Sequence, residues 1–205
     1  MAGDAGGFRH LAGYYDRAAQ ERLLAAVRAV IAEAPFYTPT MPRWGTPLSV
    51  AMTNCGTLGW LTDKSKGYRY EARHPVTGNP WPPIPELLMD LWRDLAPSAA
   101  APEACLVNWY GPKARMGLHR DADEQDFSAP VISVSLGDDA WFRVGGADRR
   151  DASERILLRS GDVAVLGGAA RLAYHGIDRI LPGTSDLLGE PGRINLTLRR
   201  VTGAS

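Results

Sequence analysis

The chain has 205 residues, of which 45% are hydrophobic, and this length and composition predict one globular domain with a sizeable core. The sequence contains no run approaching the ~20 apolar residues of a membrane span and no N-terminal export signal, so we expect a cytoplasmic protein with no membrane partner. The 23 basic and 23 acidic residues cancel, which argues against dependence on a broad phosphate-binding surface. Two cysteines, Cys55 and Cys105, are too few for a disulfide framework and are expected to be reduced.

The first half of the chain predicts two helices. Apolar residues at helical spacing run from an N-cap at Asp16 to about Glu33, and a second helix is predicted over about 86–95. Residues 35–47 hold four prolines and are expected to form an irregular connector to a strand near 48–53.

Residues 54–56 predict a turn, and an aromatic-rich segment over 57–75 follows it. Trp60, Tyr68 and Tyr70 are interleaved there with basic residues. Aromatic and cationic side chains together are the composition of a base-stacking platform. Aromatic residues that pad a loop onto a core are equally common, so both interpretations stay open on the residues alone.

The second half of the chain reads as short strands broken by Gly, Pro and Asp. We predict eight of them, at 104–110, 116–119, 130–137, 140–145, 155–158, 162–166, 171–178 and 192–201. Eight strands without intervening helices are typical of a double-sheet jelly roll. The expected fold is therefore mainly β with flanking helices.

His119 and Asp121 form a His-x-Asp pair within the predicted strands. In an extended backbone, residues i and i+2 point to the same face with Cα atoms roughly 6–7 Å apart. An imidazole and a carboxylate at this spacing can take adjacent positions on one metal ion. Two histidines and one carboxylate are the ligand set of non-haem Fe(II) oxygenases. Taken alone, such a pair is more often a surface salt bridge.

The chain has four histidines, and His175 is the best candidate for the third ligand. His10 lies in an N-terminal stretch that is expected to be mobile, and His74 precedes a proline in a turn-rich segment. His175 stands in a predicted strand and is followed by Gly176.

The C-terminal stretch 193–199 alternates strictly between polar and apolar residues. One face carries Arg193, Asn195, Thr197 and Arg199, and the other carries Ile194, Leu196 and Leu198. A half-exposed strand with its polar face in water would show the same pattern. A metal centre that binds a dicarboxylate, however, needs a fixed cation, and an arginine fork on a strand supplies it.

These residues, in this order, resemble the AlkB family of Fe(II)/2-oxoglutarate-dependent nucleic-acid dealkylases. The resemblance extends to residues 54–60, 80–82, 104–110, 133–137 and 161–163 and covers about three quarters of the chain. It implies a single domain over 1–205, with a double-stranded β-helix (jelly-roll) core over about 104–201. It also implies a substrate-binding lid over about 48–80.

The resemblance further implies the roles of individual residues. Fe(II) would be held by the catalytic residues His119, Asp121 and His175. The 2-oxoglutarate co-substrate would be bound by Asn108, Tyr110, Arg193, Asn195 and Arg199, with Arg199 at its distal carboxylate and Arg193 near its metal-chelating end. Substrate contacts would come from Trp60, Tyr68, Tyr70, Asp123 and Arg149.

Some of these roles remain open on the residues alone. Tyr110 can equally be a buried core phenol, and Asp123 belongs to an acidic run of the kind that usually faces solvent. Arg150 stands beside Arg149 and competes for its role. The chain also departs from the family at Arg120 and Ala122, and in the loop 182–192, whose function is therefore in doubt.

By the same resemblance, the expected reaction is oxidative demethylation of bases of the 1-methyladenine or 3-methylcytosine type in DNA, and possibly RNA. It uses Fe(II), 2-oxoglutarate and O2 and releases formaldehyde, succinate and CO2. We expect a monomer that acts on alkylated nucleic acid in DNA repair and prefers single strands. One alternative is a 2-oxoglutarate-dependent hydroxylase of a small molecule or protein side chain. The other is a cupin-like module that binds a metal without turnover.

Overall fold

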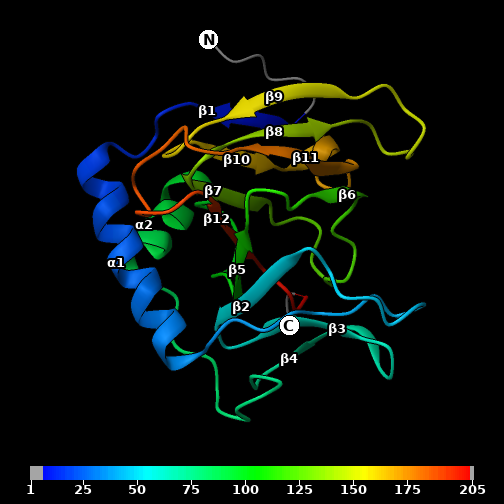
Figure 1. The fold of residues 1–205 in the computed structure, drawn as a ribbon. Helices are drawn as coiled ribbons and strands as arrows, with labels where there is room; N and C mark the ends of the chain where they lie inside the picture. Colours follow the sequence, from blue (N-terminus) through cyan, green and yellow to red (C-terminus); the bar gives the residue numbers. More distant parts are fainter. Residues whose placement is uncertain (1–6, 204–205) are drawn as a thin grey trace.

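The computed structural model describes residues 7–203, so residues 1–6 and 204–205 of the predicted domain lie outside the described part (Figure 1). In chain order its elements are β1 (Phe8–Leu11), α1 (Arg17–Glu33), β2 (Val50–Gly56), β3 (Gly59–Asp63), β4 (Gly67–Glu71), α2 (Glu86–Leu95), β5 (Ala104–Tyr110), β6 (Met116–His119), β7 (Val131–Gly137), β8 (Asp139–Val144), β9 (Glu154–Leu158), β10 (Val163–Leu166), the 3₁₀ turn η1 (Gly168–Ala170), β11 (His175–Leu181) and β12 (Arg193–Arg199).

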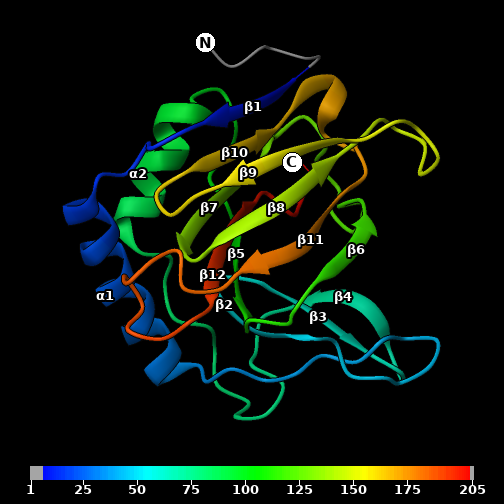
Figure 2. The same cartoon turned by 45° about the horizontal axis from the view of Figure 1, so that its top comes forward.

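Two antiparallel sheets form the body of the molecule (Figure 2). The major sheet has the order β1-β10-β7-β12-β5-β2, and the minor sheet has the order β6-β11-β8-β9. Strands β3 and β4 form a separate hairpin below them in Figure 1. The predicted jelly-roll core is confirmed.

Apolar side chains fill the space on both faces of the major sheet. On the outer face, Leu23 of α1 and Leu88 of α2 pack with Leu196 of β12 in one buried cluster. Between the sheets, Tyr110 of β5 and Phe142 of β8 belong to a second cluster. Each fully buried leucine stabilises the fold by roughly 1.5–3 kcal/mol.

Strand β12 lies in the middle of the major sheet and is buried on both faces. Its apolar side chains belong to the cluster on the helical side. Its polar residues line the space between the sheets, where Arg193 is 0% exposed and Arg199 is 6% exposed. A half-exposed strand is therefore the wrong interpretation of this alternating pattern, because the polar face is enclosed.

Both predicted helices are confirmed. Helix α1 begins after Asp16, whose Oδ1 accepts a hydrogen bond from the Ala19 amide at 2.8 Å, and it ends at Glu33. Helix α2 covers the predicted range. The capping carboxylate satisfies one of the free amides of the first turn, a contribution of about 1 kcal/mol.

Two local predictions at the N-terminal side are wrong. His10 is not in a mobile tail but in β1, which pairs with β10, and its Nε2 lies 2.9 Å from Asp162 Oδ2. Residues 54–56 do not form a turn, because β2 continues to Gly56 in register with β5. Strands β3 and β4 were not predicted at all.

The predicted strand over 171–178 starts four residues late. Gly168–Ala170 forms a 3₁₀ turn first, and β11 begins at His175 and continues to Leu181.

The predicted lid segment 48–80 is divided between two parts of the structure, because β2 is an edge strand of the major sheet and the β3–β4 hairpin lies outside that sheet. Together with β1, strand β2 extends the core beyond the predicted 104–201. No helix among residues 7–203 is long and apolar enough to cross a membrane.

Candidate active site

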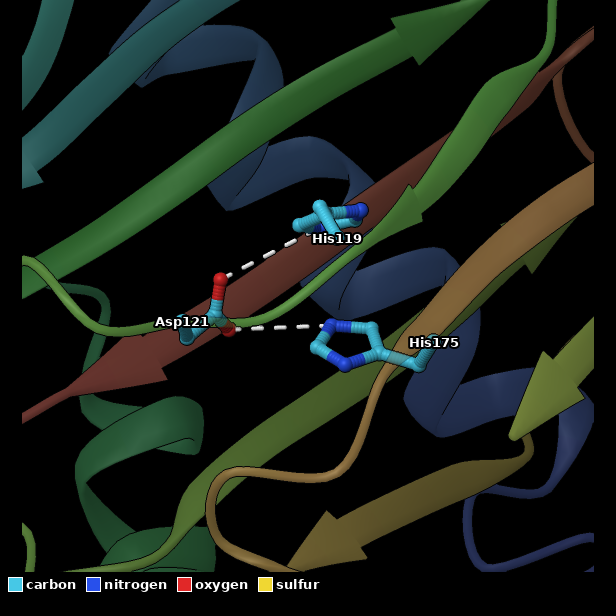
Figure 3. Close-up of side chains that lie close together, drawn as sticks. All are labelled: His119, Asp121 and His175. Atoms are coloured by element: carbon cyan, nitrogen blue, oxygen red, sulfur yellow. Dashed lines mark ion pairs between the residues drawn. The ribbon is translucent and has the colours of Figure 1, made fainter. Parts of the chain in front are cut away.

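His119, Asp121 and His175 converge at one end of the space between the sheets (Figure 3). His119 ends β6, His175 begins β11, and the register of these two strands places them directly opposite each other. Asp121 Oδ1 lies 3.9 Å from His119 Nε2, and its Oδ2 lies 3.7 Å from His175 Nε2. One ligand atom from each residue fits within a 4.8 Å cluster, a separation that suits a shared metal ion.

The hydrogen bonds of both histidines leave one ring nitrogen free for a metal. Nδ1 of His119 lies 3.0 Å from the Gly117 carbonyl, and Nδ1 of His175 lies 3.0 Å from the Ala173 carbonyl. A ring nitrogen that donates to a carbonyl fixes the tautomer in which Nε2 carries the lone pair. Burial lowers the pKa of His175 to about 4, so this ring is neutral near pH 7.

The carboxylate of Asp121 is ionised although it is buried. Burial would raise its pKa, but the positive charge of Arg199 and the two nearby imidazoles hold it at about 2. Arg199 Nη2 lies 2.7 Å from Asp121 Oδ1. Asp121 Oδ2 finds no hydrogen-bond partner among residues 7–203, as expected of an oxygen reserved for a metal.

Close backbone approach beside His175 requires a glycine. A Cβ on Gly176 would lie 2.6 Å from the Met116 carbonyl oxygen and 2.9 Å from that of Gly117. Any side chain at this position would push β6 away from β11. Gly176 therefore contributes to the metal site by allowing the two histidine-bearing strands to pair.

The site opens into a cavity of about 780 Å³ between the sheets. Of the predicted site residues, those that line it are Trp60, Tyr68, Asn108, Tyr110, His119, Asp121, Asp123, Arg149, His175, Arg193, Asn195 and Arg199. Arg150, the competitor of Arg149, is not among the lining residues, and neither is Tyr70.

Arg193 and Arg199 occupy opposite ends of the inward face of β12. Arg199 reaches the metal ligand Asp121, whereas Arg193 stands opposite Tyr110 in the β5 register and donates to Ser135 Oγ at 2.7 Å. The positions of the two arginines are therefore the reverse of the predicted order. Arg199 is at the metal end of the cavity, and Arg193 is at the far end.

Arg193 is a fully buried cation without an acidic partner in the described part of the chain. Burial lowers its pKa to about 10, so it remains charged near pH 7. Its Nε and Nη1 have no hydrogen-bond acceptor within residues 7–203, and Asn108 Oδ1 nearby on β5 also lacks a partner there. An unpaired buried charge is costly, and a bound carboxylate would compensate it.

Asn195 and Tyr110 differ in the hydrogen-bonding groups that remain available to a ligand. The amide of Asn195 donates to Ser133 Oγ and the Val134 carbonyl and accepts from Thr197, so the sheet already occupies it. The Tyr110 hydroxyl has a weak contact with Met116 Sδ at 3.7 Å. Burial raises the pKa of Tyr110 to about 12, which keeps the phenol protonated as a donor.

Sequence reasoning missed two buried residues, Glu124 and Arg171. Glu124 follows Asp123 in the acidic run, which is of a kind that usually faces solvent, but it is 4% exposed and pairs with Arg171 at 3.2 Å and Arg199 at 3.1 Å. It also accepts a hydrogen bond from the Tyr70 hydroxyl. Arg171 in turn donates to the Asp121 carbonyl at 2.9 Å, so both residues hold the metal-binding loop. A lone arginine in the otherwise small and apolar stretch 167–174 was the available signal.

Two stacked aromatic residues line the cavity on the side of the hairpin, where Tyr68 is 50% exposed, and we call this part of the cavity its mouth. Trp60 and Tyr68 stack with ring centroids 5.6 Å apart, and Trp60 Nε1 donates to Asp123 at 2.8 Å. Tyr70 was predicted to contact the substrate, but its hydroxyl is held by Glu124 and Arg199 behind the cavity wall. Tyr70 therefore connects the hairpin to Glu124 and Arg199 and does not line the cavity.

The comparisons with known proteins agree with this site. The family model of the 2OG-Fe(II) oxygenase superfamily matches residues 7–199. The chain is 53% identical over 194 residues to the alpha-ketoglutarate-dependent dioxygenase AlkB homolog of Caulobacter vibrioides (strain NA1000 / CB15N), covering 95% of this chain and 87% of the relative. It belongs to the AlkB family of Fe(II)/2-oxoglutarate-dependent dioxygenases. The expected iron, 2-oxoglutarate and O2 chemistry follows from that membership.

Two further relatives extend the similarity. An Arabidopsis thaliana protein named DNA N(6)-methyladenine demethylase ALKBH1A is 35% identical over 170 residues, covering 71% of this chain and 48% of its own length. The solved structure of OsALKBH1 superposes with a TM-score of 0.80 at 32% identity, covering 95% of this chain and 97% of that one. The AlkB fold thus spans nearly all of the described chain.

Proposed function

We propose that this AlkB-family dioxygenase removes methyl groups from N-alkylated bases of nucleic acids and so repairs alkylation damage. The observation that carries the proposal is the aromatic mouth formed by Trp60 and Tyr68, with the carboxylate of Asp123 beside it, over the three metal ligands. A flat, partly charged base of the 1-methyladenine or 3-methylcytosine type fits such a mouth. The names of the relatives, dioxygenases and a DNA demethylase, support the same substrate class.

The protein side chains divide the work in this proposal. His119, Asp121 and His175 hold iron, which together with 2-oxoglutarate and O2 supplies the oxidation of the methyl group. Arg193, Asn108 and the Tyr110 hydroxyl bind the distal carboxylate of 2-oxoglutarate. Arg199 lies next to Asp121 at the metal end.

The hairpin of β3 and β4 serves as the substrate lid in this proposal. Trp60 stacks on the base, and Tyr68, which is 50% exposed, covers it from the same strand pair. Asp123 accepts from Trp60 and stays at the mouth, where it attracts a cationic methylated base. Arg149 and Arg120 line the cavity and can contact phosphates.

A methylated base must leave its stack to enter a cavity between two sheets, and unstacking costs a few kcal/mol. We therefore propose that single strands are preferred and that the protein acts as a monomer in the cytoplasm. Two free, buried cysteines are consistent with that reducing compartment. DNA is the expected substrate, with RNA an alternative.

A panel of methylated oligonucleotides tests the proposal. Single- and double-stranded DNA and RNA carrying 1-methyladenine or 3-methylcytosine are incubated with Fe(II) and 2-oxoglutarate, and loss of the methyl group is followed by mass spectrometry. We expect demethylation by the wild type and none by His175→Ala. Turnover of 2-oxoglutarate without loss of any methyl group would favour a hydroxylase of another substrate.

A further inference from the structure

The loop between α1 and β2 presents an unusually exposed tryptophan. Trp44 is 66% exposed, more than any other aromatic side chain in the described part of the chain. The Arg43 guanidinium lies 4.6 Å from the centre of its ring, a cation–π contact that holds one face of the indole. A single exposed aromatic is ordinary on a protein surface, so its surroundings decide what it does.

The Trp44 loop is fixed against the tip of the β3–β4 hairpin, and Figures 1 and 2 both show the two tips side by side. Thr62 Oγ1 donates to the Thr40 carbonyl at 3.1 Å. A Cβ placed on Gly45 would lie 3.3 Å from the Lys64 side chain, so the two tips are in contact. Gly45 has a φ of +67°, which fixes the tight turn that presents Trp44.

Trp44 also lies close to the mouth of the cavity. Met41 and Pro47, each three residues away, both line the cavity. Three residues span at most about 11 Å. A nucleotide next to one held in the cavity is therefore within reach of the indole.

Two of the positive charges around Trp44 are not neutralised. Lys66 and Arg69 on the hairpin pair with Glu71. Arg43 and Lys64, in contrast, form no ion pair with an acidic residue of the chain over residues 7–203. Two uncompensated cations beside an open indole make a surface that favours a flat, negatively charged partner.

We propose that Trp44, Arg43 and Lys64 form a subsite for the unpaired nucleotide that flanks the methylated one in single-stranded nucleic acid. The base stacks on the indole, and the two cations contact the adjoining phosphates. An acidic peptide would use the cations but leave the indole uncovered. This inference rests on the proposed function, because it assumes a methylated nucleotide in the cavity.

The test compares substrates that do and do not reach Trp44. kcat/KM is measured for a single-stranded 1-methyladenine oligonucleotide and for the methylated nucleoside 5′-monophosphate, and their ratio is taken for each variant. Trp44→Ala should lower this ratio about five- to a hundred-fold. Trp44→Phe, which keeps an aromatic ring for stacking, should have a ratio close to that of the wild type. Val76→Ala, which truncates an exposed apolar side chain on another turn, should leave the ratio unchanged.

A second variant tests the cations. Arg43→Ala with Lys64→Ala should make the plot of log kcat/KM against log salt shallower by about 1.4 for the oligonucleotide, because two phosphate contacts are lost. A ratio and a salt slope that both match the wild type would overturn the subsite while leaving the demethylase function intact. A wild type inactive on both substrates would overturn the proposed function and the subsite together.

Discussion

At the scale of single residues, the two arginines of β12 have separable roles. Arg193 faces the far end of the cavity with free donors, whereas Arg199 is paired with Asp121 and Glu124. A bidentate clamp on a carboxylate needs the planar fork of arginine, and a lysine cannot reproduce it. The alternation in 193–199 placed both arginines on one face, and the family resemblance implied that Arg199 lies at the distal carboxylate. A local pattern cannot show which end of the cavity each side chain faces, because that depends on the strands packed opposite β12.

Arg193→Lys should raise the Kd for 2-oxoglutarate about ten-fold or more, because it loses a charge-assisted bond worth about 1.5–3 kcal/mol. Binding of 2-oxobutyrate, which lacks the distal carboxylate, should change little. Arg199→Lys should weaken the binding of both acids, because Arg199 lies at the metal end of the cavity, and the two acids are alike at that end. Calorimetric titration of the metal-loaded protein measures all four affinities. The opposite pattern would restore Arg199 to the distal carboxylate.

The buried carboxylate of Glu124 joins the hairpin, the metal loop and the clamp. Its side chain is 0% exposed and contacts Arg171, Arg199 and Tyr70. Asp121, Glu124, Arg171 and Arg199 form a buried set of two negative and two positive charges, so the removal of one leaves an uncompensated charge. The sequence marks Arg171 as unusual but could not show that it pairs with Glu124, since the two residues lie 47 positions apart along the chain.

Glu124→Gln should lower the free energy of unfolding by about 3–5 kcal/mol, because the amide keeps the shape but removes the charge. Glu154→Gln on the exposed part of β9 is the control and should stay within about 0.5 kcal/mol of the wild type. Urea denaturation at pH 7 measures both. Equal midpoints for the two variants would mean that Glu124 is not a structural hub.

At the scale of whole elements, periodicity predicted the central strands well and the peripheral ones poorly. The alternation in β12 and the cap of α1 are local signals that the chain carries within a few residues. Strand β1 has four residues and exists because it pairs with β10, more than 150 residues later. The β3–β4 hairpin lacks a tight-turn signature, so its aromatic residues were found without their strands.

The hairpin is where the repair function and a generic hydroxylase differ. Trp60→Ala should reduce kcat/KM for a methylated oligonucleotide by about five- to a hundred-fold, since a base stack is worth about 1–3 kcal/mol. Decarboxylation of 2-oxoglutarate without substrate needs the metal ligands and the arginine clamp, so it should be nearly unchanged. Succinate release in both assays measures the two effects. An equal fall in both would place Trp60 in the core.

At the scale of the whole molecule, zero net charge conceals an uneven distribution. Arg115, Arg120 and Arg149 line the cavity and make no ion pair with an acidic residue across the described chain. Many acidic residues instead pair elsewhere, as Glu86 and Asp90 do with Arg93 on α2. Composition argued against a broad phosphate-binding surface, but it could not show that these unpaired cations gather around the cavity.

In the proposed reaction, oxidation of 2-oxoglutarate is coupled to demethylation of a base. The most direct measurement is the amount of succinate and formaldehyde released in one reaction with a single-stranded oligonucleotide containing 1-methyladenine. We predict equal amounts of the two products, and succinate close to background when the same oligonucleotide carries unmodified adenine. Release of succinate at the same rate with both oligonucleotides, without formaldehyde from either, would contradict this coupling.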